Sequence, residues 1–327
     1  MINTATAPTI ALLFPGQGSQ SVGMGRALYD AYPAARAVFE EADDALGFAL
    51  SDIIFNGPED TLKLTEHTQP AILTVSIAAL RALEPELQSR NLSIAYAAGH
   101  SLGEYSAHVA AHTFSFADAV RTVRARGQFM QSAVPPGQGA MAAILGLNLP
   151  DIEATCAAVT AELAPEVVTT ANLNSPDQTV ISGSVAAVTR AAELCKELGA
   201  KRAVMLPVSG PFHSPLMMPA QHQLVDQLDN VDFQLARFPV ACNVDAQLLM
   251  QPDAIRDALI RQVTGAVRWV ECIQQLQLSD VTHYIEVGPG KVLTGLNRQI
   301  DRTLNTTNVE DPASLDKTLA ALTASPA

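Results

Sequence analysis

Short apolar runs alternate with stretches of helical periodicity along the first part of the chain. Residues 10–14 and 94–98 are compact apolar runs, and each leads directly into a glycine-rich turn, as is typical of buried strands. Helical patterns follow at 26–46, 71–83 and 104–111. Strands that alternate with helices in this way are typical of a parallel sheet covered by helices, and we predict an α/β fold.

A second unit follows the proline- and glycine-rich segment 135–139. Beyond it the pattern gives strand, helix, strand, strand, helix and strand, which is the order of a ferredoxin-like unit. The predicted strands lie at 140–147, 167–171, 179–182 and 201–206, and the predicted helices at 152–163 and 186–198. We therefore predict a small domain at 138–206, inserted into a large domain that is formed by 1–137 and 207–327.

The last third of the chain returns to the large domain. It contains a predicted helix at 255–263, a short strand at 284–287 and a helix that begins at Lys291. The residues after Asn305 are largely polar, and we expect this tail to fray.

The composition is that of a folded protein with a large apolar core. Of 327 residues, 48% are hydrophobic and 16% are charged, which excludes an intrinsically disordered chain. The 20 basic residues against 33 acidic ones give a formal net charge of -13. An acidic chain is a poor partner for nucleic acid or an anionic membrane surface, and we expect neither.

The sequence shows no targeting signal and no paired cysteine motif, and this pattern favours the cytoplasm. The N-terminal sequence lacks a basic segment followed by a long apolar one, and no window approaches the roughly 20 apolar residues of a membrane helix. Cys156, Cys195, Cys242 and Cys272 are scattered, and none belongs to a C-x-x-C pair that would predict a zinc or dithiol redox site. Few, scattered cysteines suit a reducing compartment, and we predict a cytoplasmic protein.

The segment 99–103, Gly-His-Ser-Leu-Gly, has the G-x-S-x-G spacing of a nucleophilic serine on a sharp strand-to-helix turn. Glycine on both sides lets such a turn pass close to other backbone. The start of the following helix offers free N–H groups to a developing oxyanion. We predict that Ser101 is a nucleophile, and a glycine-rich turn without chemistry is the alternative.

A nucleophilic serine needs a general base, and His213 has the most distinctive setting of the seven histidines. It lies in a glycine- and proline-rich loop at 207–215, in which Ser214 and Pro215 predict a helix start. A rigid loop before a helix holds an imidazole still, although spacing alone does not bring it near Ser101. The alternative is a loop histidine that is hydrogen-bonded to backbone.

Two further patterns argue against metal and nucleotide sites. His108 and His112 are four residues apart, but Val109 stands where a zinc-binding H-E-x-x-H helix has glutamate. The glycine loop at 15–21 has Ser21 at the third glycine position of the dinucleotide motif, and no G-K-[ST] of a P-loop occurs. We predict no metal, and the loop at 15–21 becomes a candidate source of a backbone N–H for an oxyanion.

An arginine falls on the apolar face of the next predicted helix. Ser115 and Asp118 predict the start of this helix. Arg126 follows Val123 by three residues and precedes Met130 by four, which places it on the same face as these apolar side chains. A buried guanidinium pairs either with a carboxylate of the protein or with a substrate carboxylate, and both alternatives stay open.

Taken together, nine segments resemble the malonyl-CoA:acyl carrier protein transacylase family. They occur in the family's order and span nearly the whole chain. The segments are FPGQGSQSVGMG (14–25), TQPAIL (68–73), GHSLGEYSA (99–107), RGQFMQ (126–131), GAMAAILGL (139–147), NLNSPDQTVISG (172–183), PVSGPFHSPLM (207–217), IRDALIRQV (255–263) and EVGPGKVLTGL (286–296).

The resemblance implies an α/β-hydrolase-like large domain with a ferredoxin-like insertion. It implies that malonyl passes from malonyl-CoA to the phosphopantetheine thiol of acyl carrier protein through a malonyl-serine intermediate, by ping-pong kinetics and without a metal or redox cofactor. The setting is fatty-acid or polyketide synthesis. A serine acyl hydrolase acting on acyl-carrier-protein thioesters is the alternative, and a non-catalytic scaffold is a weaker one.

The same resemblance assigns roles to individual residues. These are Ser101 as acylated nucleophile, His213 as general base, the backbone N–H groups of Gln17 and Leu102 as oxyanion hole, Arg126 as ligand of the malonyl carboxylate, the main-chain carbonyl of Gln262 as the group that orients His213, His100 as a pocket residue, and Asn172 and Asn174 as contacts of the pantetheine arm. The sequence Gly-Pro-Phe at 210–212 is closer to polyketide variants, so the pathway and the choice between malonyl and methylmalonyl stay open.

Overall fold

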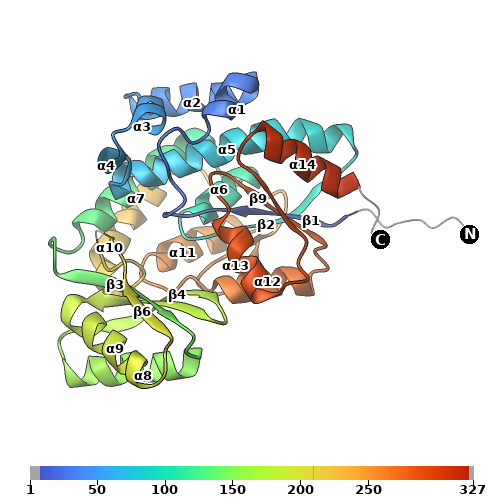
Figure 1. Ribbon diagram of the computed structural model, residues 1–327. Helices are drawn as coiled ribbons and strands as arrows, with labels where there is room; N and C mark the ends of the chain where they lie inside the picture. Colours follow the sequence, from blue (N-terminus) through green and yellow to red (C-terminus); the bar gives the residue numbers. More distant parts are fainter. Residues whose placement is uncertain (1–7, 209, 324–327) are drawn as a thin grey trace, which may run out of the picture.

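The computed structural model describes residues 8–208 and 210–323, whose strands form two separate sheets (Figure 1). The larger sheet has the strand order β10-β9-β1-β2-β7-β8. Its neighbours are parallel except for β7 and β8, which form an antiparallel pair at one edge, so the predicted parallel sheet is confirmed. Its strands are β1 (Ile10–Phe14), β2 (Ile94–Gly99), β7 (Val240–Ala241), β8 (Leu248–Leu249), β9 (His283–Val287) and β10 (Thr306–Val309).

Helices surround this sheet. Those predicted at 104–111 and 255–263, and the one predicted to begin at Lys291, lie within three residues of the predicted positions, whereas the helices at 50–56, 59–62, 269–278 and 312–323 were not predicted. The predicted helix at 26–46 is in fact two helices, because the chain becomes extended at Tyr32 before Pro33 starts the second. The helices around the larger sheet are α1 (Arg26–Ala31), α2 (Pro33–Leu46), α3 (Leu50–Asn56), α4 (Glu59–Leu62), α5 (Thr65–Ser89), α6 (Gly103–Ala110), α7 (Phe116–Ser132), the 3₁₀ helix η1 (Pro215–Met217), α10 (Met218–Leu228), α11 (Pro252–Gln262), α12 (Trp269–Leu278), α13 (Val292–Ile300) and α14 (Pro312–Thr323).

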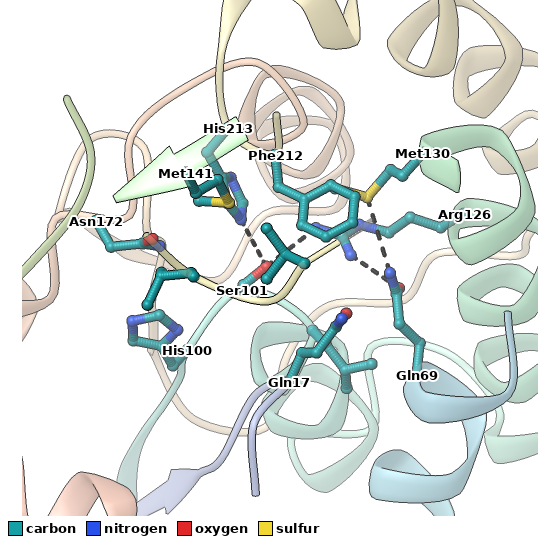
Figure 2. Close-up of a pocket in the computed structure, with 13 residues that line it drawn as sticks. Gln17, Gln69, His100, Ser101, Arg126, Met130, Met141, Asn172, Phe212 and His213 are labelled. Atoms are coloured by element: carbon teal, nitrogen blue, oxygen red, sulfur yellow. Dashed lines mark hydrogen bonds between the residues drawn. The ribbon is translucent and has the colours of Figure 1, made fainter. Parts of the chain in front are cut away.

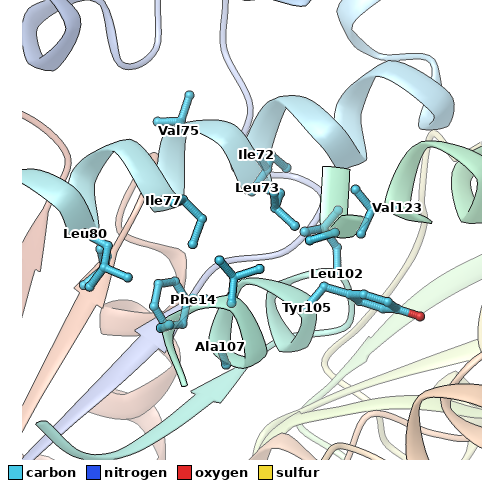
Figure 3. Packing of buried hydrophobic residues seen from close by; sticks show 14 of the residues in the cluster. Phe14, Ile72, Leu73, Val75, Ile77, Leu80, Leu102, Tyr105, Ala107 and Val123 are labelled. Atoms are coloured by element: carbon cyan, nitrogen blue, oxygen red, sulfur yellow. The ribbon is translucent and has the colours of Figure 1, made fainter. Parts of the chain in front are cut away.

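Alternate residues of the central strand β1 face two different cores, which explains its unbroken apolar sequence. The first, third and fifth residues join the main core beneath α5 and α6, and the second and fourth join a smaller core with α12 and α13. Figure 3 shows Phe14, the last residue of β1, between Ile77 of α5 and Ala107 of α6. The strand that precedes the glycine loop is thus fixed from both sides.

The smaller sheet is antiparallel, with strand order β4-β5-β3-β6. The predicted sequence of strands and helices is confirmed, and both helices pack on one face, against alternate residues of β3. The opposite face of β3 joins the main core. The domain limits given above stay a prediction. The elements are β3 (Gly139–Leu145), α8 (Leu149–Glu162), β4 (Val168–Ser175), β5 (Gln178–Ser184), α9 (Val185–Glu197) and β6 (Arg202–Met205).

The edge strand β4 is attached to the rest of the molecule by backbone hydrogen bonds. Leu173 N–H donates to the Val267 carbonyl at 2.8 Å, and Val267 N–H donates to the Ala171 carbonyl at 2.8 Å. These bonds continue the ladder of the small sheet onto the segment before α12. As a result, Asn172 and Asn174 on β4 lie next to the carboxyl end of the larger sheet, where the catalytic candidates gather.

The expectation that the tail frays after Asn305 is wrong for the described residues. Strand β10 pairs with β9 and helix α14 follows it. The start of α14 is capped by Ser314, whose hydroxyl accepts the N–H groups of Glu310 and Asp311, and by Asp311, whose carboxylate accepts Ser314 N–H. Capping and tertiary pairing thus order a segment whose polar composition suggested a free end.

Among residues 8–208 and 210–323, no helix combines the length and the apolar character needed to cross a membrane.

The turn between β2 and α6 packs directly against the end of β1. A Cβ atom at Gly103 would lie 2.0 Å from the Phe14 carbonyl oxygen, and one at Gly99 would lie 1.9 Å from the backbone of Gly103. His100 N–H also donates to the Phe14 carbonyl at 3.0 Å. Only glycine fits at either position, which confirms the steric reason for the G-x-S-x-G spacing.

Replacing Gly103 with alanine should therefore destabilise the protein. We expect Gly103→Ala to lower the free energy of unfolding by about 3 kcal/mol, because the added methyl group collides with backbone that cannot move away. The matched control is Gly295→Ala on the exposed side of α13, where an added Cβ meets nothing within 4 Å. That change should stabilise the protein by about 0.5–1 kcal/mol. Urea unfolding of both variants measures the difference, and equal effects would contradict the packing described.

Candidate active site

A cavity of about 130 Å³ lies between the two sheets, at the carboxyl ends of β1 and β2. Figure 2 shows Ser101, His213 and Arg126 pointing toward one another inside it. Every side chain or backbone group predicted for the site lines this cavity except Gln262 and Asn174, which lie just behind its wall. The lining residues are Gln17, Gln69, His100, Ser101, Leu102, Arg126, Met130, Met141, Asn172, Leu206, Val208, Phe212 and His213.

Ser101 occupies the tip of the β2–α6 turn, with φ of 51° in the left-handed region. This strained position directs its hydroxyl into the cavity. Ser101 Oγ lies 2.7 Å from His213 Nε2 and 3.2 Å from Arg126 Nη2. Its own backbone N–H donates to Asn243 Oδ1 at 2.7 Å, which ties the turn to the segment after β7. A serine in this setting has a base within hydrogen-bond reach, as a nucleophile requires.

The imidazole of His213 is oriented by main-chain oxygen atoms. His213 Nδ1 lies 2.9 Å from the Gln262 carbonyl and 3.1 Å from the Gly265 carbonyl. Both are acceptors, so Nδ1 carries the proton and Nε2 presents its lone pair to Ser101. Burial, followed by the Arg126 charge, lowers the pKa of His213 to about 3. The imidazole is therefore neutral near pH 7 and able to accept a proton.

Arg126 is buried beside Ser101, on the face of α7 that its spacing predicted. Nη1 donates to Gln69 Oε1 at 2.8 Å, and Nη2 donates to Gln262 Oε1 at 2.9 Å. Its Nε has no hydrogen-bond partner in the described chain, and the Tyr105 ring lies 5.6 Å from the guanidinium. Within that part of the chain no Asp or Glu forms an ion pair with it. Of the two alternatives left open by the sequence, an internal carboxylate partner is thus not the arrangement found.

Two backbone N–H groups line the cavity without a partner. Neither Gln17 N–H nor Leu102 N–H makes a hydrogen bond within residues 8–208 and 210–323. Leu102 precedes the first residue of α6, so its N–H belongs to the positive end of that helix. The loop that carries Gln17 is held against the turn that carries Ser101, because a Cβ at Gly16 would lie 2.4 Å from the His100 carbonyl oxygen. Both groups are therefore candidates for an oxyanion hole.

His100 connects the turn to the small sheet. Its Nε2 lies 2.8 Å from Asn174 Oδ1 on β4, and its ring centroid is 5.6 Å from that of Trp269. Burial lowers the pKa of His100, so the ring is neutral and donates to the asparagine oxygen. Asn172, on the same strand, lines the cavity. The small sheet thus supplies one wall of the site.

Four residues of the site escaped the sequence analysis: Gln69, Glu104, Asn243 and Gly265. Gln69 lies in the first turns of α5, which begins at Thr65 rather than at the predicted residue 71. The polar residues before 71 gave no sign that the helix begins there. The available signal for Gln69 was a single glutamine next to the apolar helical pattern. Asn243 and Gly265 act through contacts that no local pattern encodes.

His108 and His112 do not come together as a metal site. His108 is fully buried with Nδ1 3.3 Å from Thr113 Oγ1, whereas His112 lies past the end of α6 with a positive φ. In the part of the chain that the structure describes, no three His, Cys, Asp or Glu side chains are placed to hold a metal ion.

The chain matches the family model described as acyl transferase domain over residues 11–317. It is 49% identical to the malonyl CoA-acyl carrier protein transacylase of Bacillus subtilis (strain 168), over 96% of this chain and 97% of that protein. The crystal structure of the acyl-carrier-protein S-malonyltransferase from Burkholderia pseudomallei 1710b is 48% identical and superposes with a TM-score of 0.90, covering 95% and 99% of the two chains.

A third similar protein has been solved with a partner. It is a malonyl-transacylase in complex with its type II PKS acyl-carrier protein, 43% identical with a TM-score of 0.90, covering 95% of this chain and 99% of that one. The family model and these relatives each cover nearly the whole chain, which confirms the resemblance found in the sequence and the mixed α/β class of the fold. The chain belongs to the malonyl CoA-acyl carrier protein transacylases, a family of acyl transferases.

Proposed function

We propose that this protein transfers a malonyl group from malonyl-CoA to the phosphopantetheine thiol of an acyl carrier protein, through an ester on Ser101. The observation that carries the proposal is a buried arginine, bonded only to neutral oxygen atoms, 3.2 Å from the nucleophile hydroxyl. A malonyl group is an acyl group with a free carboxylate, which is the ligand such an arginine lacks. The names of the similar proteins support the same substrate and partner.

In the first half-reaction, Ser101 Oγ attacks the thioester carbonyl carbon while its proton passes to His213 Nε2. The carbonyl oxygen becomes an oxyanion, and the free N–H groups of Gln17 and Leu102 stabilise it. Each such donor is typically worth about 3–4 kcal/mol. The carbon–sulfur bond then breaks, and CoA leaves with the proton held by His213. The product is malonyl-Ser101.

In the second half-reaction, the carrier-protein thiol gives its proton to His213 and attacks the ester carbonyl. The same N–H groups stabilise the second oxyanion. Ser101 Oγ leaves with the proton from His213, and malonyl is bound to the carrier thiol. The main-chain carbonyls of Gln262 and Gly265 keep the imidazole in the required tautomer throughout, which is the task of an aspartate in many serine enzymes.

Arg126 selects the acyl group by its charge. Its two η nitrogens form a planar fork that matches a carboxylate. In the free protein this fork is held by the amide oxygens of Gln69 and Gln262, which are weaker acceptors than a carboxylate. Malonyl can therefore replace a neutral partner by a charged one, whereas acetyl cannot.

A serine acyl hydrolase would use the same nucleophile and base. The carboxylate fork argues against it, because a general acyl hydrolase gains nothing from a buried cation in its acyl pocket. The similar proteins are named as transacylases and malonyltransferases, which also favours transfer. We propose that this protein acts in the synthesis of fatty acids or polyketides on a carrier protein, and the similar protein solved with a type II PKS acyl-carrier protein supports such a setting.

We propose a cytoplasmic location. All four cysteines are free thiols and buried, which suits a reducing compartment.

The ester intermediate can be observed directly. On mixing with malonyl-CoA, wild-type protein should gain the mass of one malonyl group, and Ser101→Ala should not. The adduct should persist in buffer and disappear when carrier protein with its phosphopantetheine arm is added. Intact-protein mass spectrometry measures each step. An adduct that hydrolyses equally fast without carrier protein would favour the hydrolase instead.

Removal of the guanidinium should change the acyl preference. We expect Arg126→Ala to lower kcat/KM for malonyl-CoA about 100-fold, corresponding to loss of a buried charge pair worth about 3 kcal/mol. Loading with acetyl-CoA should fall less or rise, because acetyl makes no use of the charge. Steady-state rates with both substrates test this, and an unchanged ratio would refute the proposed fork.

The low pKa of His213 gives a further test. With its pKa lowered to about 3, His213 should stay neutral with the proton on Nδ1 between pH 8 and pH 5. A free imidazole would gain a second proton near pH 6.5 in this interval. The ¹⁵N chemical shifts of its ring, assigned by comparison with His213→Gln, report the protonation state. A titration midpoint between pH 6 and 7 would contradict the buried, neutral base.

A further inference from the structure

A carboxylate lies buried directly behind the site and has no part in the mechanism above. Glu104, the second residue of α6, is fully buried and does not line the cavity. Its Oε2 accepts two hydrogen bonds, from Asn243 N–H at 2.9 Å and from Gln262 Nε2 at 2.7 Å. Burial of a carboxylate is unfavourable unless hydrogen bonds compensate for it. The influence of Glu104 on the site must therefore pass through Asn243 and Gln262.

The bond to Gln262 fixes which way that side-chain amide faces. An ionised carboxylate only accepts hydrogen bonds, so the Gln262 NH₂ group must point toward Glu104. The same NH₂ donates to the Ser101 carbonyl at 3.0 Å. The amide oxygen is thereby turned to Arg126 Nη2, at 2.9 Å. With the amide reversed, an NH₂ group would face the guanidinium, and two donors would meet.

The bond to Asn243 extends to the nucleophile. Asn243 Oδ1 accepts Ser101 N–H, and Asn243 Nδ2 donates to the Gly99 carbonyl, both at 2.7 Å. These bonds hold the strained turn on both sides of the serine. Glu104 is therefore connected to two groups. Through the Gln262 side chain it is connected to the guanidinium of Arg126, and through Asn243 it is connected to the backbone of Ser101.

The charged groups around Glu104 are few. Arg126 favours its ionised form and Asp245 opposes it. His108 Nε2 lies 4.0 Å from Glu104 Oε1, but burial lowers the pKa of His108 to about 3, so that ring is neutral. Burial raises the pKa of Glu104 itself to about 7, and the carboxylate is mostly ionised at pH 8.

We infer that Glu104 is a positioning residue for acyl selection, which acts through Gln262 to present an amide oxygen to Arg126 and keep its fork in place for the malonyl carboxylate. The inference rests on the proposed role of Arg126. Loss of these two connections should affect acyl loading differently. Loss of the Asn243 connection disturbs Ser101 and slows loading with every acyl group. Loss of the Gln262 connection disturbs Arg126 as well as the Ser101 carbonyl, and therefore slows loading with malonyl more than loading with acetyl.

The test is the ratio of kcat/KM for malonyl-CoA to that for acetyl-CoA in acylation of Ser101, measured at pH 8. Glu104→Met keeps the length of the side chain but removes the acceptor, and we expect the ratio to fall at least tenfold. Glu104→Gln can place its own amide oxygen where Oε2 lies and should restore most of the ratio. A role in stability alone would lower both rates together and leave the ratio unchanged.

A matched control and a double variant sharpen the result. Glu286 is a second fully buried glutamate, whose carboxylate caps the start of α13 through Leu293 and Thr294. Glu286→Met should lower stability without changing the ratio. In Gln262→Met protein, which keeps the main-chain carbonyl for His213, addition of Glu104→Met should lower the ratio no further, because Glu104 acts through that amide.

The outcomes separate this inference from the proposed function. If Arg126→Ala loses the malonyl preference but Glu104→Met keeps it, the inference is wrong and the proposed function stands. If Arg126→Ala keeps the preference, the proposed function itself is wrong. Should Glu104→Met not fold, Glu104→Asp gives the same test, because a carboxylate one methylene shorter no longer reaches the Gln262 amide. A wild-type ratio in Glu104→Asp would then overturn the inference.

Discussion

A guanidinium buried among neutral oxygen atoms, next to a serine hydroxyl, is the constraint on which this site depends. A charge removed from water is unfavourable unless hydrogen bonds or an opposite charge compensate for it. Arg126 has two amide oxygens and the hydroxyl of Ser101 as partners, and no carboxylate in contact within the described chain. The fold therefore holds a cation whose best ligand has to come from outside, at the point where we propose that acyl transfer takes place.

The rest of the architecture keeps Ser101, His213 and this cation together. The glycines around Ser101 let the turn rest on the end of β1, and the two-sided burial of β1 fixes that end. The carboxyl end of α11 and the residues after it supply main-chain carbonyls to His213, while the side chain of Gln262 reaches Arg126. Gln262 thus contacts His213 through its main-chain carbonyl and Arg126 through its side chain. Because these groups are preorganised, little rearrangement is needed when an acyl group enters.

Local patterns in the sequence predicted the parts of the molecule that local physics determines. Helical spacing placed Arg126 on a buried face, and the run of apolar residues at 10–14 predicted a strand covered on both sides. The same reasoning failed where long-range contacts decide. The polar residues after Asn305 are ordered by pairing with β9 and by capping at Ser314, neither of which composition reveals. Asn243 belongs to the site only because folding brings it 2.7 Å from Ser101 N–H, across a large separation in sequence. The Gln262 carbonyl was predicted as a partner of His213 from the family resemblance, not from spacing, and the Gly265 carbonyl was not predicted.

A crystal structure of the malonyl-enzyme, trapped with malonyl-CoA, tests the central claim most directly. The account predicts that the free carboxylate of the ester on Ser101 lies within hydrogen-bond distance of both η nitrogens of Arg126, with the amide oxygen of Gln69 or Gln262 displaced or sharing its donor. A malonyl carboxylate that points to solvent, while Arg126 keeps both of its glutamine partners, would contradict it.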